Sequence, residues 1–269
     1  MDDRPVGIFD SGFGGLTVLR AINDLMPHER LVYFGDSARY PYGPKSREEV
    51  SAYSLQIAEL LAERYDIKML VVACNTASAQ ALPQLVERFP IPVVGMIEPG
   101  ARALAMQSMG ERIGVIGTVG TIGSGAYQTR LSQIAPKKRL VCAATPGFVE
   151  FVERGETGTD QVKVLAERLL RPVIDAKVQT LLLGCTHYPF LARAIGEVLG
   201  PETMLVSSSE ETAFEVRHAL LEADLASTSA GPADIVYLTS GDPDEFRRVG
   251  RSLLGIELRD VVPVKWAGE

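Results

Sequence analysis

The sequence is poor in cysteine, with only three among its 269 residues. Three widely spaced cysteines do not make the even-numbered framework of a disulfide-stabilised protein, so we expect reduced thiols. No apolar run approaches the roughly 18–20 residues that a membrane-spanning helix needs. The amino-terminal MDDRPVG also lacks the basic-then-apolar pattern of a secretory signal. We therefore expect a cytoplasmic protein without a membrane partner.

Basic residues are also in short supply. The chain has 27 Lys and Arg against 34 Asp and Glu, which gives a net charge of −7. A nucleic-acid-binding protein normally carries a basic stripe, so no nucleic-acid partner is expected. Hydrophobic residues make up 46% of the chain and charged residues 23%. That balance is typical of a globular protein with a proper core.

Short apolar runs alternate with amphipathic stretches along almost the whole chain. Residues 46–65 and 157–175 repeat apolar side chains at the helical spacing of three and four. Strands that alternate with helices indicate βαβ units and an α/β fold with mainly parallel sheets. Buried strands are predicted at residues 6–10, 30–36, 68–74, 91–96, 112–118, 139–145, 179–185, 203–208 and 234–240.

Two pairs of similar segments indicate an internal duplication. VVACNTASA resembles LLLGCTHYPF, and their cysteines, Cys74 and Cys185, lie 111 positions apart. VGIFDSGFGGL resembles IGVIGTVGTIGSG, and Gly7 and Gly114 lie 107 positions apart. Nearly equal offsets predict two pseudo-symmetric α/β domains, the first formed by residues 1–96 plus 209–269 and the second by residues 97–208.

The duplication has a consequence for the two cysteines. Ligands of open α/β sheets bind beyond the carboxyl ends of the strands, where Cys74 and Cys185 are both predicted. An approximate twofold axis would therefore place the two thiols on opposite walls of one inter-domain cleft. Such a pair suits inversion at a carbon with a weakly acidic hydrogen, because one group removes the proton and the other delivers one to the opposite face. A thiol with a reference pKa of about 8.5 supplies thiolate with modest electrostatic help.

Other roles for cysteine fit the sequence less well. Zinc would need closely spaced ligands, and the only near pair is Cys185 with His187, so no metal is expected. A Cys–His hydrolase would use one nucleophile and leave the second thiol unexplained. Cys142 lies inside an apolar run without polar neighbours and is assigned to the core.

Polar residues at the predicted strand ends are candidate functional groups. Asp10 in FDSGFGG is placed to relay a proton or to bind an ammonium group. The glycines beside it do not make a dinucleotide-binding fingerprint, since Thr17 occupies the last glycine's place. His187 lies two residues after Cys185 and can set the protonation of that thiol. Further candidates at the ligand edge are Tyr42, Gly43, Thr118 and Thr121.

The motifs FDSGFGGL, GDSARYPYG, ACNTAS, GVIGTVGTIGSGAY and GCTHYP resemble the signatures of the glutamate racemases of bacterial peptidoglycan synthesis, over essentially the whole chain. The resemblance implies interconversion of L- and D-glutamate without pyridoxal phosphate or any other cofactor. It implies Cys74 and Cys185 as the catalytic thiols, with Asp10 and His187 as their proton partners. The implied substrate contacts are Asp10, Ser11, Tyr42, Gly43, Asn75, Thr76, Thr118, Thr121, Thr186 and His187.

Two further points accompany the resemblance. Glu153 of FVERG matches a family carboxylate near the second thiol, and Thr145-Pro146 stands where the family usually has Cys-Pro. A related racemase, such as one for aspartate, and a non-catalytic amino-acid binder remain alternatives, although a binder would not need both thiols. The oligomeric state stays open, with a homodimer among the options.

Overall fold

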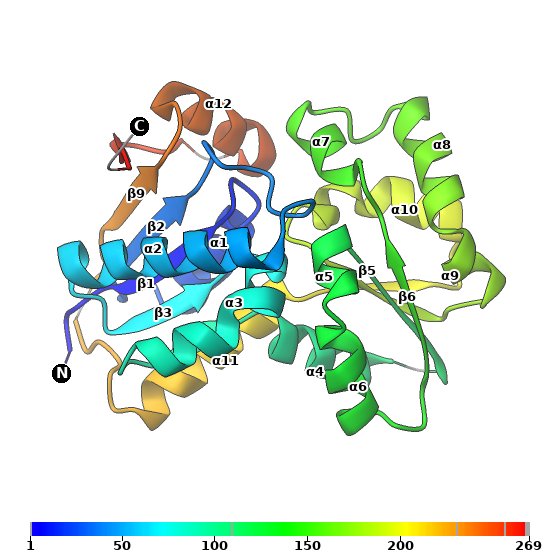
Figure 1. Ribbon diagram of the computed structural model, residues 1–269, viewed down its shortest axis with the longest axis horizontal. Coiled ribbons are helices and arrows are strands. Elements are labelled where there is room, and N and C mark those ends of the chain that lie inside the picture. The colour runs from blue at the N-terminus through cyan, green and yellow to red at the C-terminus, as the bar shows by residue number, and fades with distance from the viewer. Residues whose placement is uncertain (1, 109, 230, 256, 267–269) are drawn as a thin grey trace.

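The computed structural model describes residues 2–108, 110–229, 231–255 and 257–266, and its strands form two sheets (Figure 1). The first sheet has the order β10-β9-β2-β1-β3-β4 and the second has the order β6-β5-β7-β8. Every strand pair in both sheets is parallel. The strands of the first sheet are β1 (Val6–Asp10), β2 (Leu31–Gly35), β3 (Met69–Val72), β4 (Val93–Gly95), β9 (Ile235–Thr239) and β10 (Val261–Pro263), and those of the second are β5 (Arg112–Gly117), β6 (Arg139–Ala144), β7 (Thr180–Gly184) and β8 (Met204–Ser207).

The two sheets share one strand order. The run β2-β1-β3-β4 of the first sheet corresponds to β6-β5-β7-β8 of the second. Gly7 of β1 and Gly114 of β5 therefore lie on equivalent strands, and so do the residues that precede Cys74 and Cys185. The predicted α/β fold with two pseudo-symmetric, mainly parallel sheets is confirmed.

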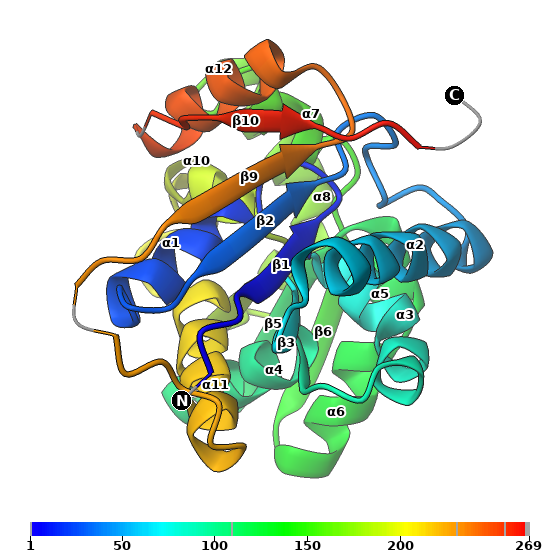
Figure 2. The same ribbon diagram turned by 90° about the vertical axis from the view of Figure 1, so that its left-hand side faces the viewer.

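Helices cover both faces of the first sheet (Figure 2). Alternate residues of a strand point to opposite faces, so Ile8 packs with one layer of helices and Phe9 with the other. The layer beside Ile8 consists of α1 (Leu16–Leu25), α11 (Ser209–Glu222) and α12 (Pro243–Leu254). The layer beside Phe9 consists of α2 (Arg47–Tyr65) and α3 (Asn75–Arg88).

The second sheet is covered in the same way. One face packs against α4 (Ile97–Gln107) and α6 (Ala126–Ile134), and α5 (Val119–Gly123) follows β5 directly. The other face packs against α7 (Phe148–Glu153), α8 (Asp160–Leu169), α9 (Arg171–Asp175), α10 (Ala192–Leu199) and the 3₁₀ turn η1 (Tyr188–Leu191).

The structure corrects one predicted element. The periodicity over 157–175 indicated one helix, but α8 ends at Leu169 and α9 begins at Arg171. Pro172 lies in the first turn of α9, where its missing N–H is tolerated, and it cannot donate the hydrogen bond that would continue α8. The edge strand β10 had no counterpart among the predicted strands.

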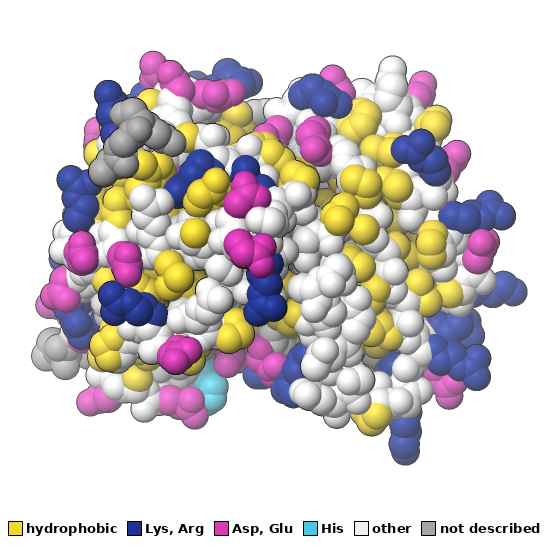
Figure 3. Space-filling view, viewed as in Figure 1, with side chains coloured by type: hydrophobic (Ala, Val, Ile, Leu, Met, Phe, Trp, Pro, Cys, Tyr) yellow, Lys and Arg dark blue, Asp and Glu magenta, His cyan; other side chains and the backbone are white. Residues whose placement is uncertain are grey.

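Surface charge and helix composition relate to the expectations about nucleic-acid and membrane partners. Basic and acidic side chains are interspersed over the face shown in Figure 3. In the described part of the chain, no helix combines the length and the apolar character needed to cross a membrane.

Candidate active site

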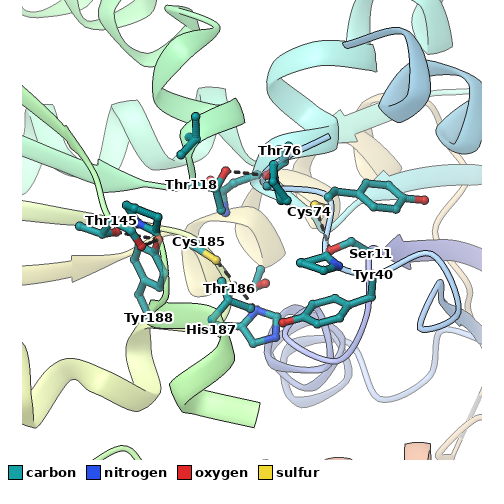
Figure 4. Close-up of a pocket in the computed structure, with 18 of the residues that line it drawn as sticks. Ser11, Tyr40, Cys74, Thr76, Thr118, Thr145, Cys185, Thr186, His187 and Tyr188 are labelled. Carbon is teal, nitrogen blue, oxygen red and sulfur yellow. Dashed lines mark hydrogen bonds between the residues drawn. The ribbon is translucent and has the colours of Figure 1, made fainter. Parts of the chain in front are cut away.

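One cavity lies at the carboxyl ends of the central strands of both sheets (Figure 4). Its volume of about 90 Å³ suits a small molecule. Among the predicted site residues, Thr121 and Glu153 do not line this cavity. Those that line it are Asp10, Ser11, Tyr42, Gly43, Cys74, Asn75, Thr76, Thr118, Cys185, Thr186 and His187.

Cys74 stands between the end of β3 and the first turn of α3, of which it is the N-cap residue. Its Sγ donates to the Ser11 Oγ at 3.6 Å, and the Ser11 hydroxyl donates to Asp10 Oδ1 at 3.4 Å. The other carboxylate oxygen of Asp10 accepts from the Gly15 N–H at 2.7 Å. A polar chain therefore runs from the thiol to a fixed, buried carboxylate.

The surroundings of Cys74 favour its neutral form. Burial raises the pKa of the Cys74 thiol well above its usual range, and the negative charge of Asp10 raises it further. Hydrogen bonding with the Ala77 backbone and with Ser11 acts in the opposite direction. At neutral pH Cys74 is therefore a thiol, which is the form that donates a proton.

Cys185 follows β7 and has a different neighbour. Its Sγ lies 3.9 Å from Nδ1 of His187, and the Nε2 of the same ring lies 3.1 Å from Glu153 Oε1 on α7. Burial lowers the pKa of His187, but hydrogen bonds to Cys185 and Glu153 outweigh it and raise this pKa to about 10. A cationic imidazole therefore lies beside the Cys185 Sγ.

The two thiols lie on opposite sides of the cavity (Figure 4). Cys74 comes from the first sheet and Cys185 from the second, and both are free and buried. Cys142, the remaining cysteine, lies half-buried in β6 and does not line the cavity. The arrangement therefore presents two thiols, one from each sheet, to the same small space.

Donors for an anionic ligand gather at the start of α3. The Asn75 Oδ1 accepts from the Tyr127 hydroxyl at 2.6 Å, whereas its Nδ2 is buried without a hydrogen-bond partner among the described residues. The Thr76 Oγ1 lies 2.9 Å from the Thr118 Oγ1 across the cavity wall. Backbone N–H groups at a helix start also favour negative charge, so this corner can hold a carboxylate.

Tyr42, Gly43 and Thr121 act through their surroundings. Tyr42 lines the cavity, and its hydroxyl donates to Asp36. The Gly43 carbonyl accepts from the Gly120 N–H at 2.9 Å, which joins the two halves of the molecule. The Thr121 Oγ1 lies 3.0 Å from the Thr118 Oγ1, behind the cavity wall.

The cavity lining also includes residues that the sequence reasoning missed, among them Tyr40, Glu150 and Tyr188. The Tyr40 ring lies 6.1 Å from the His187 ring, centroid to centroid. Thr145, at the departure from the family pattern, donates its hydroxyl to the Tyr188 hydroxyl at 2.7 Å. Neither contact could be predicted from a local sequence pattern, because each joins side chains that are far apart in the sequence.

The described residues contain no group of three or more His, Cys, Asp or Glu side chains suited to a metal ion.

Comparison with known proteins agrees with the fold. A family model described as Asp/Glu/Hydantoin racemase matches residues 15–212. The chain belongs to this family of isomerases. A glutamate racemase of Geobacter metallireducens is 48% identical over 266 residues, which are 99% of this chain and 98% of that protein.

Solved structures of glutamate racemases are similar over nearly the whole chain. An isoform from Bacillus anthracis has a TM-score of 0.93 at 37% identity, and the match covers 98% of each chain. The enzyme from Francisella tularensis, solved in complex with D-glutamate, has a TM-score of 0.91 at 32% identity and the same coverage. Within the family, the chain is therefore similar to the glutamate racemases.

Proposed function

We propose that this isomerase interconverts L- and D-glutamate by a two-base mechanism in which Cys74 and Cys185 act on opposite faces of the α-carbon. The observation that carries the proposal is that equivalent strand ends of the two sheets deliver one thiol each to a single cavity. The names of the relatives and the D-glutamate in the Francisella structure support glutamate as the substrate.

The protonation states of the two thiols define the chemical step. In one direction the Cys185 thiolate takes the α-hydrogen, so that an S–H bond forms and the Cα–H bond breaks. The electron pair of that bond moves into the α-carboxylate, and the Cys74 thiol delivers its proton to the opposite face of the α-carbon. The reverse direction begins with a Cys74 thiolate and a Cys185 thiol.

The residues around each thiol supply what this step needs. The charge of Asp10 raises the pKa of Cys74. A substrate ammonium group beside Asp10 would offset its charge and make the Cys74 thiolate accessible. The free Asn75 Nδ2 and the first turn of α3 would hold a carboxylate and stabilise the charge that develops on it.

Polarimetry of purified protein tests the proposal. L-glutamate, supplied without pyridoxal phosphate and after dialysis against a chelator, should lose its optical rotation completely, because the equilibrium mixture is racemic. An unchanged rotation, or activity that disappears with the chelator, contradicts the proposal. A faster loss of rotation with L-aspartate favours the aspartate racemase alternative.

We also propose that the D-glutamate serves peptidoglycan precursor synthesis in the cytoplasm. Expression of this chain in a bacterial strain that requires added D-glutamate should remove the requirement, whereas the Cys74→Ser variant should not. The bounds 1–96 plus 209–269 and 97–208 remain our proposal for the two domains. A homodimer remains a prediction that sedimentation analysis can test.

A further inference from the structure

The cavity wall at Tyr42 is held from behind by a buried carboxylate. Asp36 is fully buried and accepts the Tyr42 hydroxyl on Oδ2 and the Ser240 hydroxyl on Oδ1, the latter at 2.7 Å. The Arg39 Nε donates to both oxygens, at 3.1 and 2.8 Å. Arg39 therefore provides the positive charge that keeps this carboxylate, and with it the Tyr42 hydroxyl, in place.

Arg39 is itself held between two aromatic rings. Its guanidinium carbon lies 4.2 Å from the ring centroid of Tyr53 on α2 and 4.2 Å from that of Trp266. Its Nη1 donates to Gln56 Oε1 at 2.6 Å. Tyr53 also packs against Tyr42, with ring centroids 5.8 Å apart. Two routes therefore connect Arg39 to the cavity wall, one through Asp36 and one through Tyr53.

Trp266 brings the end of the chain into this arrangement. It is the only tryptophan in the sequence and follows β10 at the edge of the first sheet. Trp266 is 8% exposed, and its ring packs against Phe34 of β2 at 5.5 Å between centroids. The Val264 N–H donates to the Thr239 carbonyl at 2.8 Å, which fixes the segment that carries the ring.

We propose that Arg39 is a positioning residue for substrate binding and that Trp266 acts through it. The stacked guanidinium fixes Asp36 and Tyr53, which in turn fix the wall formed by Tyr42 and Gly43. Gly43 also accepts the hydrogen bond from Gly120 of the second half, so the same wall connects the two halves beside the cavity. This inference rests on the proposed glutamate racemisation.

The chemistry of Arg39 is specific to a planar guanidinium. A cation between two ring faces within 6 Å gains attraction from both, and the gain is larger where water is excluded. Lysine would keep the charge but lose the planar group, with its several N–H donors and its flat faces. Coupling between two sites acts in both directions. If the packing of Trp266 favours the wall conformation that binds glutamate, then bound glutamate favours the packed position of Trp266.

Steady-state kinetics of Trp266 variants test the proposal without leaving Asp36 unpaired. Trp266→Leu should raise the KM for glutamate by about tenfold, the order expected for loss of one desolvated cation–ring contact, with kcat nearly unchanged. Trp266→Phe should fall in between because it keeps a ring. Arg88→Met is the matched control, since Arg88 lies 5.7 Å from the Phe89 ring and pairs with Glu59 on the surface. Its KM should equal that of the parent enzyme.

Fluorescence provides a second, independent measurement. Glutamate should protect Trp266 from quenching by acrylamide in the parent enzyme. Tyr42→Phe should reduce the protection, because it cuts the route through Asp36 and leaves the ring packing with Tyr53 in place. A Trp266→Leu variant with an unchanged KM overturns the inference, and so does a variant whose kcat falls at constant KM, which is the mark of a smaller folded fraction. Failure of the parent enzyme to racemise glutamate overturns the proposed function instead.

Discussion

The Sγ of Cys185 lies 3.9 Å from Nδ1 of His187, whose other nitrogen lies 3.1 Å from Glu153. The equivalent thiol, Cys74, is linked through Ser11 to the carboxylate of Asp10. Duplicated positions thus have opposite electrostatic surroundings, a cation at one thiol and an anion at the other. The proposed mechanism uses that difference to make Cys74 the acid and Cys185 the base, although the two residues are chemically identical.

The cation at Cys185 predicts how activity depends on pH. His187 has a pKa of about 10 in the folded protein against an ordinary value of 6.5. Protonated His187 therefore contributes fully to the free energy of unfolding below pH 6.5. This contribution is lost as the pH rises through about 10. Glu153→Gln removes one cause of the raised pKa, so the alkaline limb of kcat/KM and the alkaline loss of stability should both move to lower pH.

The matched control for this substitution lies close by. Glu156 is half-exposed and pairs with Arg154 on the surface, so Glu156→Gln should leave both profiles unchanged. Identical alkaline limbs for Glu153→Gln and the parent enzyme would show that the imidazolium is not what sustains the Cys185 thiolate.

The anion at Cys74 makes a prediction of opposite sign. Asp10→Asn removes a charge that raises the pKa of Cys74, so this thiol should ionise at lower pH. Thiolate absorbance shows the shift cleanly when Cys142 and Cys185 are both replaced by Ser. In the enzyme with its own cysteines, Asp10→Asn should lower kcat by about a hundredfold or more through loss of proton relay.

The exposed Asp24 of α1 supplies the control, since Asp24→Asn should change neither titration nor kcat. An unchanged Cys74 titration in Asp10→Asn would mean that burial alone sets the ionisation of this thiol.

A buried ion pair at the opposite end of β3 predicts an effect on stability alone. The Lys68 Nζ is fully buried and lies 2.7 Å from Glu29 Oε2, and it also donates to the Asp2 carbonyl. Lys68→Met leaves the Glu29 charge unpaired and should lower the free energy of unfolding by about 3–5 kcal/mol. Arg88→Met, which breaks an exposed pair, should cost less than about 1 kcal/mol.

Denaturant unfolding of Lys68→Met, Arg88→Met and the double variant Lys68→Met, Glu29→Met measures these differences. The double variant should recover part of the loss, because no charge is left buried alone. Equal losses for the two single variants would contradict the assigned role of the buried pair. The kcat of the folded Lys68→Met enzyme should match that of the parent.

The sequence was sufficient for features that depend on neighbouring residues. The strand over 6–10 coincides with β1 because an apolar, β-branched run ends directly at a polar loop. The places of Cys74 and Cys185 at equivalent strand ends followed from the repeated pattern. The Arg39–Trp266 contact could not be predicted in this way, since 227 positions separate the two residues and no local pattern relates them.

The helix break before Pro172 shows a different kind of error. The apolar periodicity continues through the proline, so the pattern outweighed the backbone chemistry that ends α8.

The position of Thr121 behind Thr118 depends on how the first turn after β5 packs against Thr76. Spacing alone could not tell a hydroxyl that faces the cavity from one that supports it.

Hydrogen exchange by cysteine variants tests the two-base account most directly. Cys74→Ser and Cys185→Ser should both lose racemisation, because a hydroxyl is too weak an acid to replace thiolate as the base at neutral pH. Cys142→Ser, remote from the cavity, should retain it. In heavy water, followed by NMR, each inactive variant should still exchange the α-hydrogen of one enantiomer without inversion, and the two variants should prefer opposite enantiomers. Near-native racemisation by either Cys74→Ser or Cys185→Ser would contradict the account.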